Sequence, residues 1–519
     1  MIEVYGWIIV GMATLPFWID LIRYRQIVFE NPLHIPFLLL ALFMGFRLVF
    51  LSSPNSWGLF QNLTGIMDPV PVFESISYYV IASMIAMMAG YYLFAKPLLK
   101  TTGISLSWSR MNGEGLSRIR LPGLIVISLI FLGLIVWSQR QLMIGGFANT
   151  SGYIYMLNLS KVGLMMLITA YLISRLPYRL RDSIFNPTYI VILIAYGIYL
   201  YTSFSTQGRF MLVAPFIGLG ILLLRFNPTS IKLKYVFLLS LVIAFFYFNL
   251  AGALRIANEE GEQGRELNFQ NIYRWYTERL STAEDFNGVE GMAFNMVHFN
   301  DEEGYLWGKS YAAILWHWWP RGFVKEYFGI EKPFTVGIHL KGVFLDDSNK
   351  FSDEINRERG TLGFSSTFVG QNYENFGFVG GTIFAFFMGA GLALLFNWVT
   401  RRYYSISVQT FYACFLASMP SLARGGAIAI DLANGFMGYL PVLVVFILFK
   451  APGARWFPKA SPQQEVITDD PNQMPAFPDI PGVGGPPGFP PAPPMPVSRV
   501  KLINYPQRTL EPPVPNKLG

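Results

Sequence analysis

Arginines stand at positions where the chain can present positive charge to a bound anion. Arg209, Arg255 and Arg424 each fall at an end of a long apolar stretch, and Arg321 follows the aromatic run WHWWP. A guanidinium binds phosphate oxygens through two parallel hydrogen bonds and keeps its charge at any physiological pH. We therefore expect these four arginines to hold a phosphate or a diphosphate.

His298, His317 and Glu374 are the residues that can take a proton from an attacking hydroxyl. Histidine titrates near neutral pH, and a carboxylate close to a membrane surface can serve the same purpose. The sequence does not rank the three, and a purely structural role fits each histidine as well. Their spacing lacks the HExxH pattern of zinc enzymes, so we predict no metal and no cofactor.

Tryptophans cluster within one short segment, YLWGKSYAAILWHWWPRG, which contains Trp307, Trp316, Trp318 and Trp319. Indoles anchor proteins at the membrane interface. Their faces also stack on the apolar C–H surface of sugar rings, and for this role we favour Trp316, Trp318 and Trp319. Pro320 should bend the chain after them and leave the next residue at the edge of the cluster.

The composition places these residues in a membrane protein. Hydrophobic residues make up 53% of the 519 residues, charged residues make up 14%, and the mean hydropathy is +0.39. A soluble protein would carry about a quarter charged residues. The formal net charge of +7 fits loops that face the anionic cytoplasmic leaflet, and nucleic acid is not expected as a partner. Cys414 is the single cysteine, which excludes an intrachain disulfide.

Apolar stretches long enough to cross a bilayer recur along the chain. A span needs about 20 mainly apolar residues, and the runs are too continuous for barrel strands. We therefore expect an all-α polytopic membrane protein with about 11 transmembrane helices. The expected spans are 5–22, 33–52, 72–95, 121–138, 154–174, 187–204, 209–225, 234–254, 375–398, 405–420 and 428–449.

Basic residues of the short loops fall mainly after spans 1, 3, 5, 7 and 9. Positive charge is enriched in cytoplasmic loops, so we expect the N-terminus outside and the C-terminus in the cytoplasm. Cations near the outer surface run against this bias and either snorkel to the interface or together form an anion-binding surface. These cations are Arg47, Arg140, Lys161, Arg209, Arg255 and Arg424.

The spans divide the chain into four parts. Residues 1–254 hold transmembrane helices 1–8, and residues 366–450 hold helices 9–11. Residues 255–365 form a large extracytoplasmic loop, charged and aromatic, which we expect to be folded and to contain amphipathic helices. Residues 451–519 are rich in proline and are expected to be a disordered cytoplasmic tail.

The segment NYENFGFVGG, residues 372–381, leads into the ninth span. Gly377, Gly380 and Gly381 permit either close helix packing or a break in the helix at the entrance to the span. An ordinary structural turn is the alternative. The segment also holds Glu374, which places that carboxyl close to the membrane surface.

The chain resembles the O-antigen or oligosaccharide repeat-unit polymerases (Wzy-type) of bacterial cell envelopes. The resemblance rests on GRF at 208–210 between two spans, on the run Y311…WWPR…EKP at 311–333 in a large external loop, and on NYENFGFVGG at 372–381. It covers about residues 1–450. The proline-rich tail departs from the pattern.

The resemblance implies metal-independent glycosyl transfer at the outer face of the bacterial inner membrane. The donor would be a glycan on undecaprenyl diphosphate, attacked by the terminal hydroxyl of another lipid-linked repeat. Membrane lipid and a chain-length regulator or flippase of the same pathway are the expected partners. An O-antigen ligase, which transfers the glycan to another acceptor, is the nearest alternative. A secondary transporter is the alternative from another class, although the unusual charges gather near one surface rather than at mid-membrane.

Overall fold

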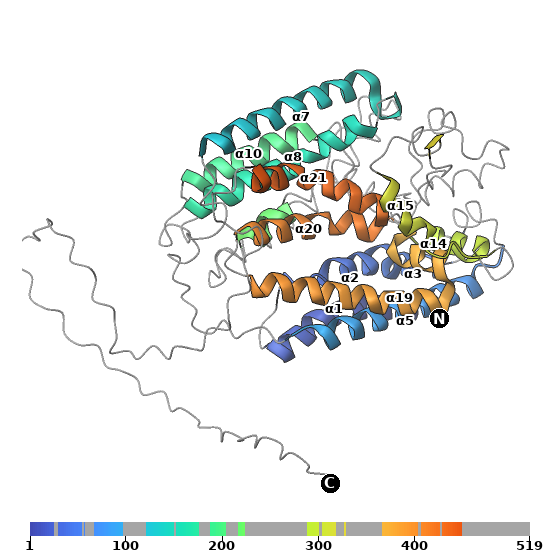
Figure 1. Ribbon diagram of the computed structural model, residues 1–519. Coiled ribbons are helices and arrows are strands. Elements are labelled where there is room, and N and C mark those ends of the chain that lie inside the picture. The colour runs from blue at the N-terminus through green and yellow to red at the C-terminus, as the bar shows by residue number, and fades with distance from the viewer. Residues whose placement is uncertain are drawn as a thin grey trace, which may run out of the picture. The chain divides into compact units, whose positions relative to one another are not determined.

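The computed structural model of the chain is built from helices (Figure 1). It describes residues 1–24, 28, 30–53, 57, 67–96, 121–149, 152–175, 187–203, 216–223, 288–299, 304–317, 326–327, 366–402, 406–425 and 428–448. These residues form helices and no strand, which confirms the all-α prediction for this part of the chain. They all belong to the unit Met1–Pro462. The second unit, Gln463–Gly519, lies outside the described residues, as does the whole of the predicted tail.

Most of the helices overlap the predicted spans, and α14 (Gly288–His298) and α15 (Lys309–His317) fall within the predicted loop 255–365. The helices are α1 (Ile2–Tyr24), α2 (His34–Leu40), the π-helical turn η1 (Ala41–Gly45), α3 (Phe46–Phe50), α5 (Val70–Phe94), α7 (Leu121–Asn149), α8 (Gly152–Arg175), α10 (Pro187–Ser203), α14 (Gly288–His298), α15 (Lys309–His317), α19 (Thr367–Arg401), α20 (Ile406–Gly425) and α21 (Ile428–Leu448). Every predicted span overlaps helical residues except 234–254, which lies outside the described residues.

Helix α7 runs past its predicted end at residue 138 to Asn149. Its apolar run is followed by Gln139, Arg140 and Gln141, which favour helix and contain no breaker. Arg140 therefore lies inside the helix, where it is exposed, and not in the loop that the sequence predicted.

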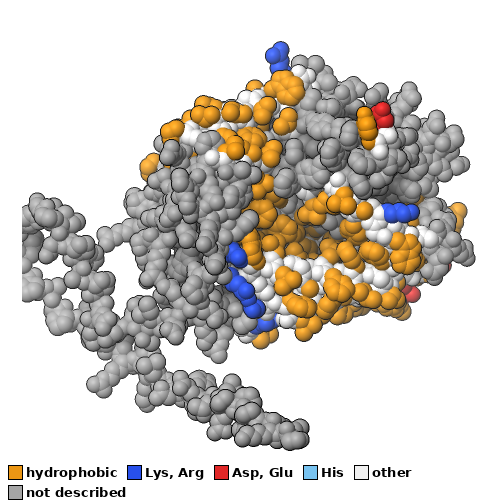
Figure 2. All heavy atoms as spheres, viewed as in Figure 1, with side chains coloured by type: hydrophobic (Ala, Val, Ile, Leu, Met, Phe, Trp, Pro, Cys, Tyr) orange, Lys and Arg blue, Asp and Glu red, His pale blue; other side chains and the backbone are white. Residues whose placement is uncertain are grey.

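Among the described residues, four helices are long and apolar enough to cross a membrane: Ile2–Arg23, Val70–Phe94, Pro122–Gln141 and Thr367–Arg401. Large apolar side chains on their surfaces are exposed, such as Leu129 in α7 and Phe387 in α19. Exposed side chains of this kind suit hydrocarbon as the solvent, and Figure 2 shows hydrophobic side chains over much of the described part of one face. The number of 11 spans remains a prediction.

Helices α5 and α19 lie side by side and touch through glycines. A Cβ added at Gly90 would lie 2.0 Å from the carbonyl oxygen of Phe386, and one at Gly389 would lie 2.0 Å from that of Met87. Lipid tails are as apolar as leucine, so close van der Waals packing of backbones replaces the hydrophobic effect as the force between such helices.

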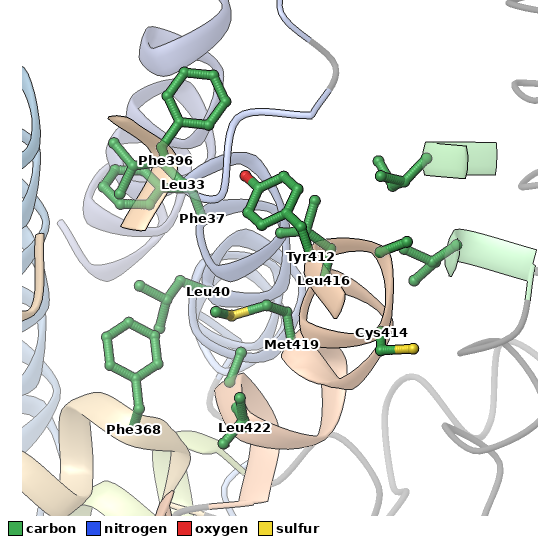
Figure 3. Close-up of a cluster of buried hydrophobic side chains, with 14 of the residues drawn as sticks. Leu33, Phe37, Leu40, Phe368, Phe396, Tyr412, Cys414, Leu416, Met419 and Leu422 are labelled. Carbon is green, nitrogen blue, oxygen red and sulfur yellow. The ribbon is translucent and has the colours of Figure 1, made fainter. Parts of the chain in front are cut away.

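A cluster of buried apolar side chains joins α2, α19 and α20 (Figure 3). Phe37 of α2 and Phe396 of α19 lie near Tyr412 of α20, whose hydroxyl donates to the carbonyl of Glu30 over 2.6 Å. Helix α20 also packs against α8 and α21, and α7 and α10 pack against α8. The helices on the two sides of α20 therefore share one core.

The two ends of the bundle differ in composition. Arg23 donates hydrogen bonds to the carbonyls of Tyr92 and Ala95, both over 2.8 Å, and the backbone N–H of Lys96 donates to Asn397 over 2.9 Å. Arg402, just after α19, lies at this end as well, and Figure 2 shows basic side chains gathered there. Helices α14 and α15 lie at the opposite end, beside the start of α19 (Figure 1).

Adding one methyl group at Gly389 should destabilise the protein, because the backbone of α5 leaves no room for it. We expect Gly389→Ala to lower the stability by roughly 1–3 kcal/mol, as overpacking does in other cores. The measurement is thermal unfolding of the protein in detergent or nanodiscs, followed by circular dichroism. Gly391→Ala, two residues along the same helix, is the control because its added Cβ would meet nothing within 4 Å. Equal melting temperatures for the two variants would contradict the packing.

Candidate functional site

Helix α19 breaks at Gly377. This residue has φ 66° and ψ −165°, a conformation that side chains disfavour, so the helix consists of two segments that meet there. The ring of Tyr305 lies against the break, and a Cβ at Gly377 would come within 2.7 Å of its Cζ atom. Of the alternatives that the sequence left open here, the structure shows the break in the helix.

A short segment between α14 and α15 covers this break. We call residues 304–308 the strap. The N–H of Leu306 donates to the carbonyl of Glu374 over 3.0 Å, and the N–H of Trp307 donates to the carbonyl of Asn375 over 2.9 Å. The strap therefore supplies donors to two carbonyls in the last turn before the break, where a helix otherwise leaves carbonyls unpaired.

Ser310, in the first turn of α15, is the centre of a polar cluster on α19. Its Oγ accepts hydrogen bonds from Gln371 Nε2 over 2.8 Å and from Asn375 Nδ2 over 2.6 Å. Because two amide groups donate to this oxygen, its own proton is left to donate. One hydroxyl thus links α15 to two side chains of α19.

Glu374 is the predicted site residue that the structure describes most fully. Only 2% of its surface is exposed, and its Oε2 has no hydrogen-bond partner among the described residues. Buried carboxyls are rare unless they are paired, and those in clefts are frequent catalytic groups. An oxygen of this kind can accept a hydrogen bond, and then a proton, from a hydroxyl group of a ligand.

Tyr311 extends the cluster by one residue. Its hydroxyl donates to Asn372 Oδ1, and its ring stacks on Phe384 with centroids 4.8 Å apart. Burial raises the pKa of the Tyr311 hydroxyl well above its ordinary value of 10.0, and the nearby Tyr79 and Glu374 raise it further. Tyr311 therefore stays protonated at physiological pH and acts as a donor rather than as a base.

Arg47 does not belong to an anion site, which corrects the prediction for this residue. Its Nε and Nη2 donate to Glu290 Oε1 over 2.9 and 2.5 Å, and both side chains are buried. Arg47 lies in α3 and Glu290 in α14, so the ion pair ties these two helices together. Its guanidinium meets a carboxylate of the protein where we expected a ligand.

The other outer cations that the structure describes lie in different surroundings. Arg140 is exposed on α7. Lys161 is buried in α8, and its Nζ lies 5.4 Å from the centre of the Tyr199 ring. The described residues therefore give no single surface that unites Arg140, Lys161 and Arg47.

The start of α19 carries further buried polar atoms. Asn295 of α14 donates from Nδ2 to the carbonyl of Gly370 over 3.1 Å, and its Oδ1 has no partner among the described residues. The hydroxyls of Ser366 and Thr367 are buried and likewise lack partners within that part of the chain. Thr367 has φ 60°, which is strained for a β-branched residue, and such strain is concentrated at functional sites.

The remaining predicted residues lie on neighbouring elements or outside the described residues. His298 ends α14 and His317 ends α15, and both helices contact α19. Trp316 lies in the last turn of α15 and Arg424 in that of α20, but the side chains of these four residues are outside what the structure describes. The predicted residues for which nothing is described are Arg209, Arg255, Arg321, Trp318 and Trp319.

Sequence reasoning missed Glu290 and Ser310. Glu290 stands in the apolar run VEGMAF, where a lone acid is expected to be buried and paired, and this signal could have found it. Ser310 carries no such signal, because an isolated serine at the start of a helix usually serves only as a cap.

No family model, no curated protein and no solved structure matches this chain. Function is therefore argued from the residues of the site.

The Arg47–Glu290 pair should hold the large loop on the bundle. Removing one partner leaves a buried charge unpaired, so Arg47→Leu and Glu290→Leu should each cost roughly 3–5 kcal/mol. The double variant should cost clearly less than the sum of the two, because it leaves no unpaired charge. The measurement is a double-mutant cycle of unfolding free energies in detergent. Strictly additive losses would show that the pair does not form.

Proposed function

We propose that the chain polymerises oligosaccharide repeat units carried on undecaprenyl diphosphate, by metal-independent glycosyl transfer at the outer face of the bacterial inner membrane. The product would be an O-antigen, a capsule or an exopolysaccharide. The observation that carries the proposal is the buried Glu374 carboxyl, whose Oε2 lacks a partner among the described residues and which lies where the strap and α15 meet the break in α19.

The segments that carry the resemblance to Wzy-type polymerases support this proposal. Tyr311, which opens one of these segments, bonds to Asn372, which opens another. Two short sequences that are 61 residues apart thus contribute to one polar cluster. The third segment, GRF at 208–210, lies outside the described residues.

The proposed reaction needs a proton acceptor and a stabilised leaving group. The terminal hydroxyl of one lipid-linked repeat attacks the anomeric carbon of the other glycan, and its proton passes to Glu374. The bond between that carbon and the diphosphate oxygen breaks, and undecaprenyl diphosphate leaves with the electron pair. Arg209, Arg255 and Arg321, with Arg424, would neutralise the charge that develops on the diphosphate.

The arrangement of charge supports the proposed sidedness. The basic end of the bundle would face the cytoplasm, since positive charge is retained there. Helices α14 and α15 occupy the opposite end, so the polar cluster would face the compartment that receives flipped lipid-linked glycans. No nucleotide reaches that side, which fits a donor already activated by its diphosphate.

Gene deletion separates the candidate functions. Loss of a polymerase should leave surface glycan of a single repeat and remove the ladder of longer chains on a gel. Loss of an O-antigen ligase should cause lipid-linked chains to accumulate, and loss of a transporter should leave the glycan pattern unchanged. Either of the last two patterns would refute the polymerase proposal.

Replacing the carboxyl should stop turnover and leave the fold intact. We expect Glu374→Gln to lower kcat by about 10²–10⁴-fold, the usual contribution of a general base, because glutamine keeps the shape but cannot take the proton. The assay is chain elongation in proteoliposomes with purified lipid-linked repeats. Glu326→Gln is the control, since Glu326 is an exposed acid of the same loop. Wild-type turnover in Glu374→Gln would remove Glu374 from the mechanism.

A further inference from the structure

Trp307 is an exposed aromatic side chain that the fold holds in an unusual backbone conformation. Its surface is 75% exposed, and its φ is 48°, in the left-handed region where a bulky residue is an outlier. The N–H of Trp307 donates to the carbonyl of Asn375, and the preceding Leu306 does the same to Glu374. The strap therefore fixes this indole beside the residue that carries the candidate base.

A series of ring contacts connects the indole to the buried Tyr79. Trp307 meets Tyr305 with centroids 6.3 Å apart and planes at 88°. Tyr305 meets Tyr373 at 6.2 Å, and Tyr373 meets the buried Tyr79 at 5.2 Å. Because 75% of the Trp307 surface is exposed, the contact with Tyr305 leaves much of the indole open. The series thus connects the helix core to an open aromatic surface.

We propose that Trp307 is a stacking platform for a pyranose ring of the acceptor glycan. A pyranose ring has an apolar C–H face that stacks on indole, while its hydroxyls remain free to reach neighbouring polar groups. A sugar on Trp307 would lie next to the segment of α19 that bears Glu374. This inference rests on the proposed function and adds to it a binding residue for the acceptor.

Anchoring in lipid headgroups is the other role of an exposed tryptophan. An interface anchor needs no fixed backbone, because an indole on an extended loop reaches the headgroups equally well. Here two hydrogen bonds hold the strained residue in register with Glu374 and Asn375. A fixed position of the indole suits a ligand that must be aligned with a reacting group. The structure therefore favours a glycan over lipid headgroups as the partner of Trp307.

The test uses the full-length protein in nanodiscs and two kinds of measurement. Saturation-transfer NMR detects binding of soluble tetrasaccharides of glucose, galactose, mannose or rhamnose. Kinetics with lipid-linked repeats give KM for the acceptor and kcat. The variants are Trp307→Ala and Trp307→Phe, which keeps a ring. Trp18→Ala is the control, since Trp18 is 58% exposed on α1.

We expect Trp307→Ala to weaken saturation transfer clearly and to raise KM about 10-fold with little change in kcat, the pattern of lost ground-state binding. Trp307→Phe should lie between Trp307→Ala and wild type, and Trp18→Ala should behave as wild type. The platform is refuted if no sugar binds the wild type, or if Trp307→Ala binds as well as the wild type. Quenching of tryptophan fluorescence by doxyl-labelled lipids reports contact with the membrane and serves as a further control. The platform is also refuted if this quenching is the only property that Trp307→Ala changes.

The two proposals fail in different ways. Sugar binding that depends on Trp307, in a protein that elongates no chain, would sustain the platform and refute the polymerase. Chain elongation with an unchanged KM in Trp307→Ala would sustain the polymerase and refute the platform.

Discussion

Backbone hydrogen bonding at the break in α19 constrains the rest of the site. A carbonyl without a partner is costly at the edge of a membrane, so a helix can break there only where another segment supplies donors. The strap supplies them to Glu374 and Asn375. Gly377 in turn allows the ring of Tyr305 to lie against the break. The break and the docked strap therefore depend on each other.

Docking of the strap determines which side chains of α15 lie near Glu374. Helix α15 begins directly after the strap, so Ser310 and Tyr311 are delivered to the polar side chains of α19. The Arg47–Glu290 ion pair fixes the same loop a second time, through α14. A site held by two ties from one loop is preorganised, which is what positioning of a proton acceptor requires.

Local sequence patterns predicted the helices and marked a position where a break was possible. Apolar runs of about 20 residues marked α1, α5 and α19, because the bilayer sets the length of a span. Glycine at 377 marked the break, because few other residues adopt its backbone conformation. The position of Glu374 beside that break followed from the same pattern.

Long-range pairing could not be predicted from the same patterns. Arg47 and Glu290 are 243 residues apart, and local periodicity does not show that these two meet. Arg47 was therefore counted among cations that either snorkel or bind an anion, whereas it pairs with Glu290. The strap was missed for a related reason: its contacts use backbone N–H groups, which every residue except proline carries. The predictions for Arg209, Arg255 and Arg321 remain untested, since these residues lie outside the described ranges.

Hydrogen exchange at the strap tests the central claim most directly, because the claim is that backbone donors of the loop are bonded to α19. The measurement is amide exchange of Leu306 and Trp307 in the nanodisc-embedded protein, compared with an unstructured peptide of the same sequence. The account predicts far slower exchange in the protein, since both N–H groups are bonded to α19. Exchange as fast as in the peptide would contradict it.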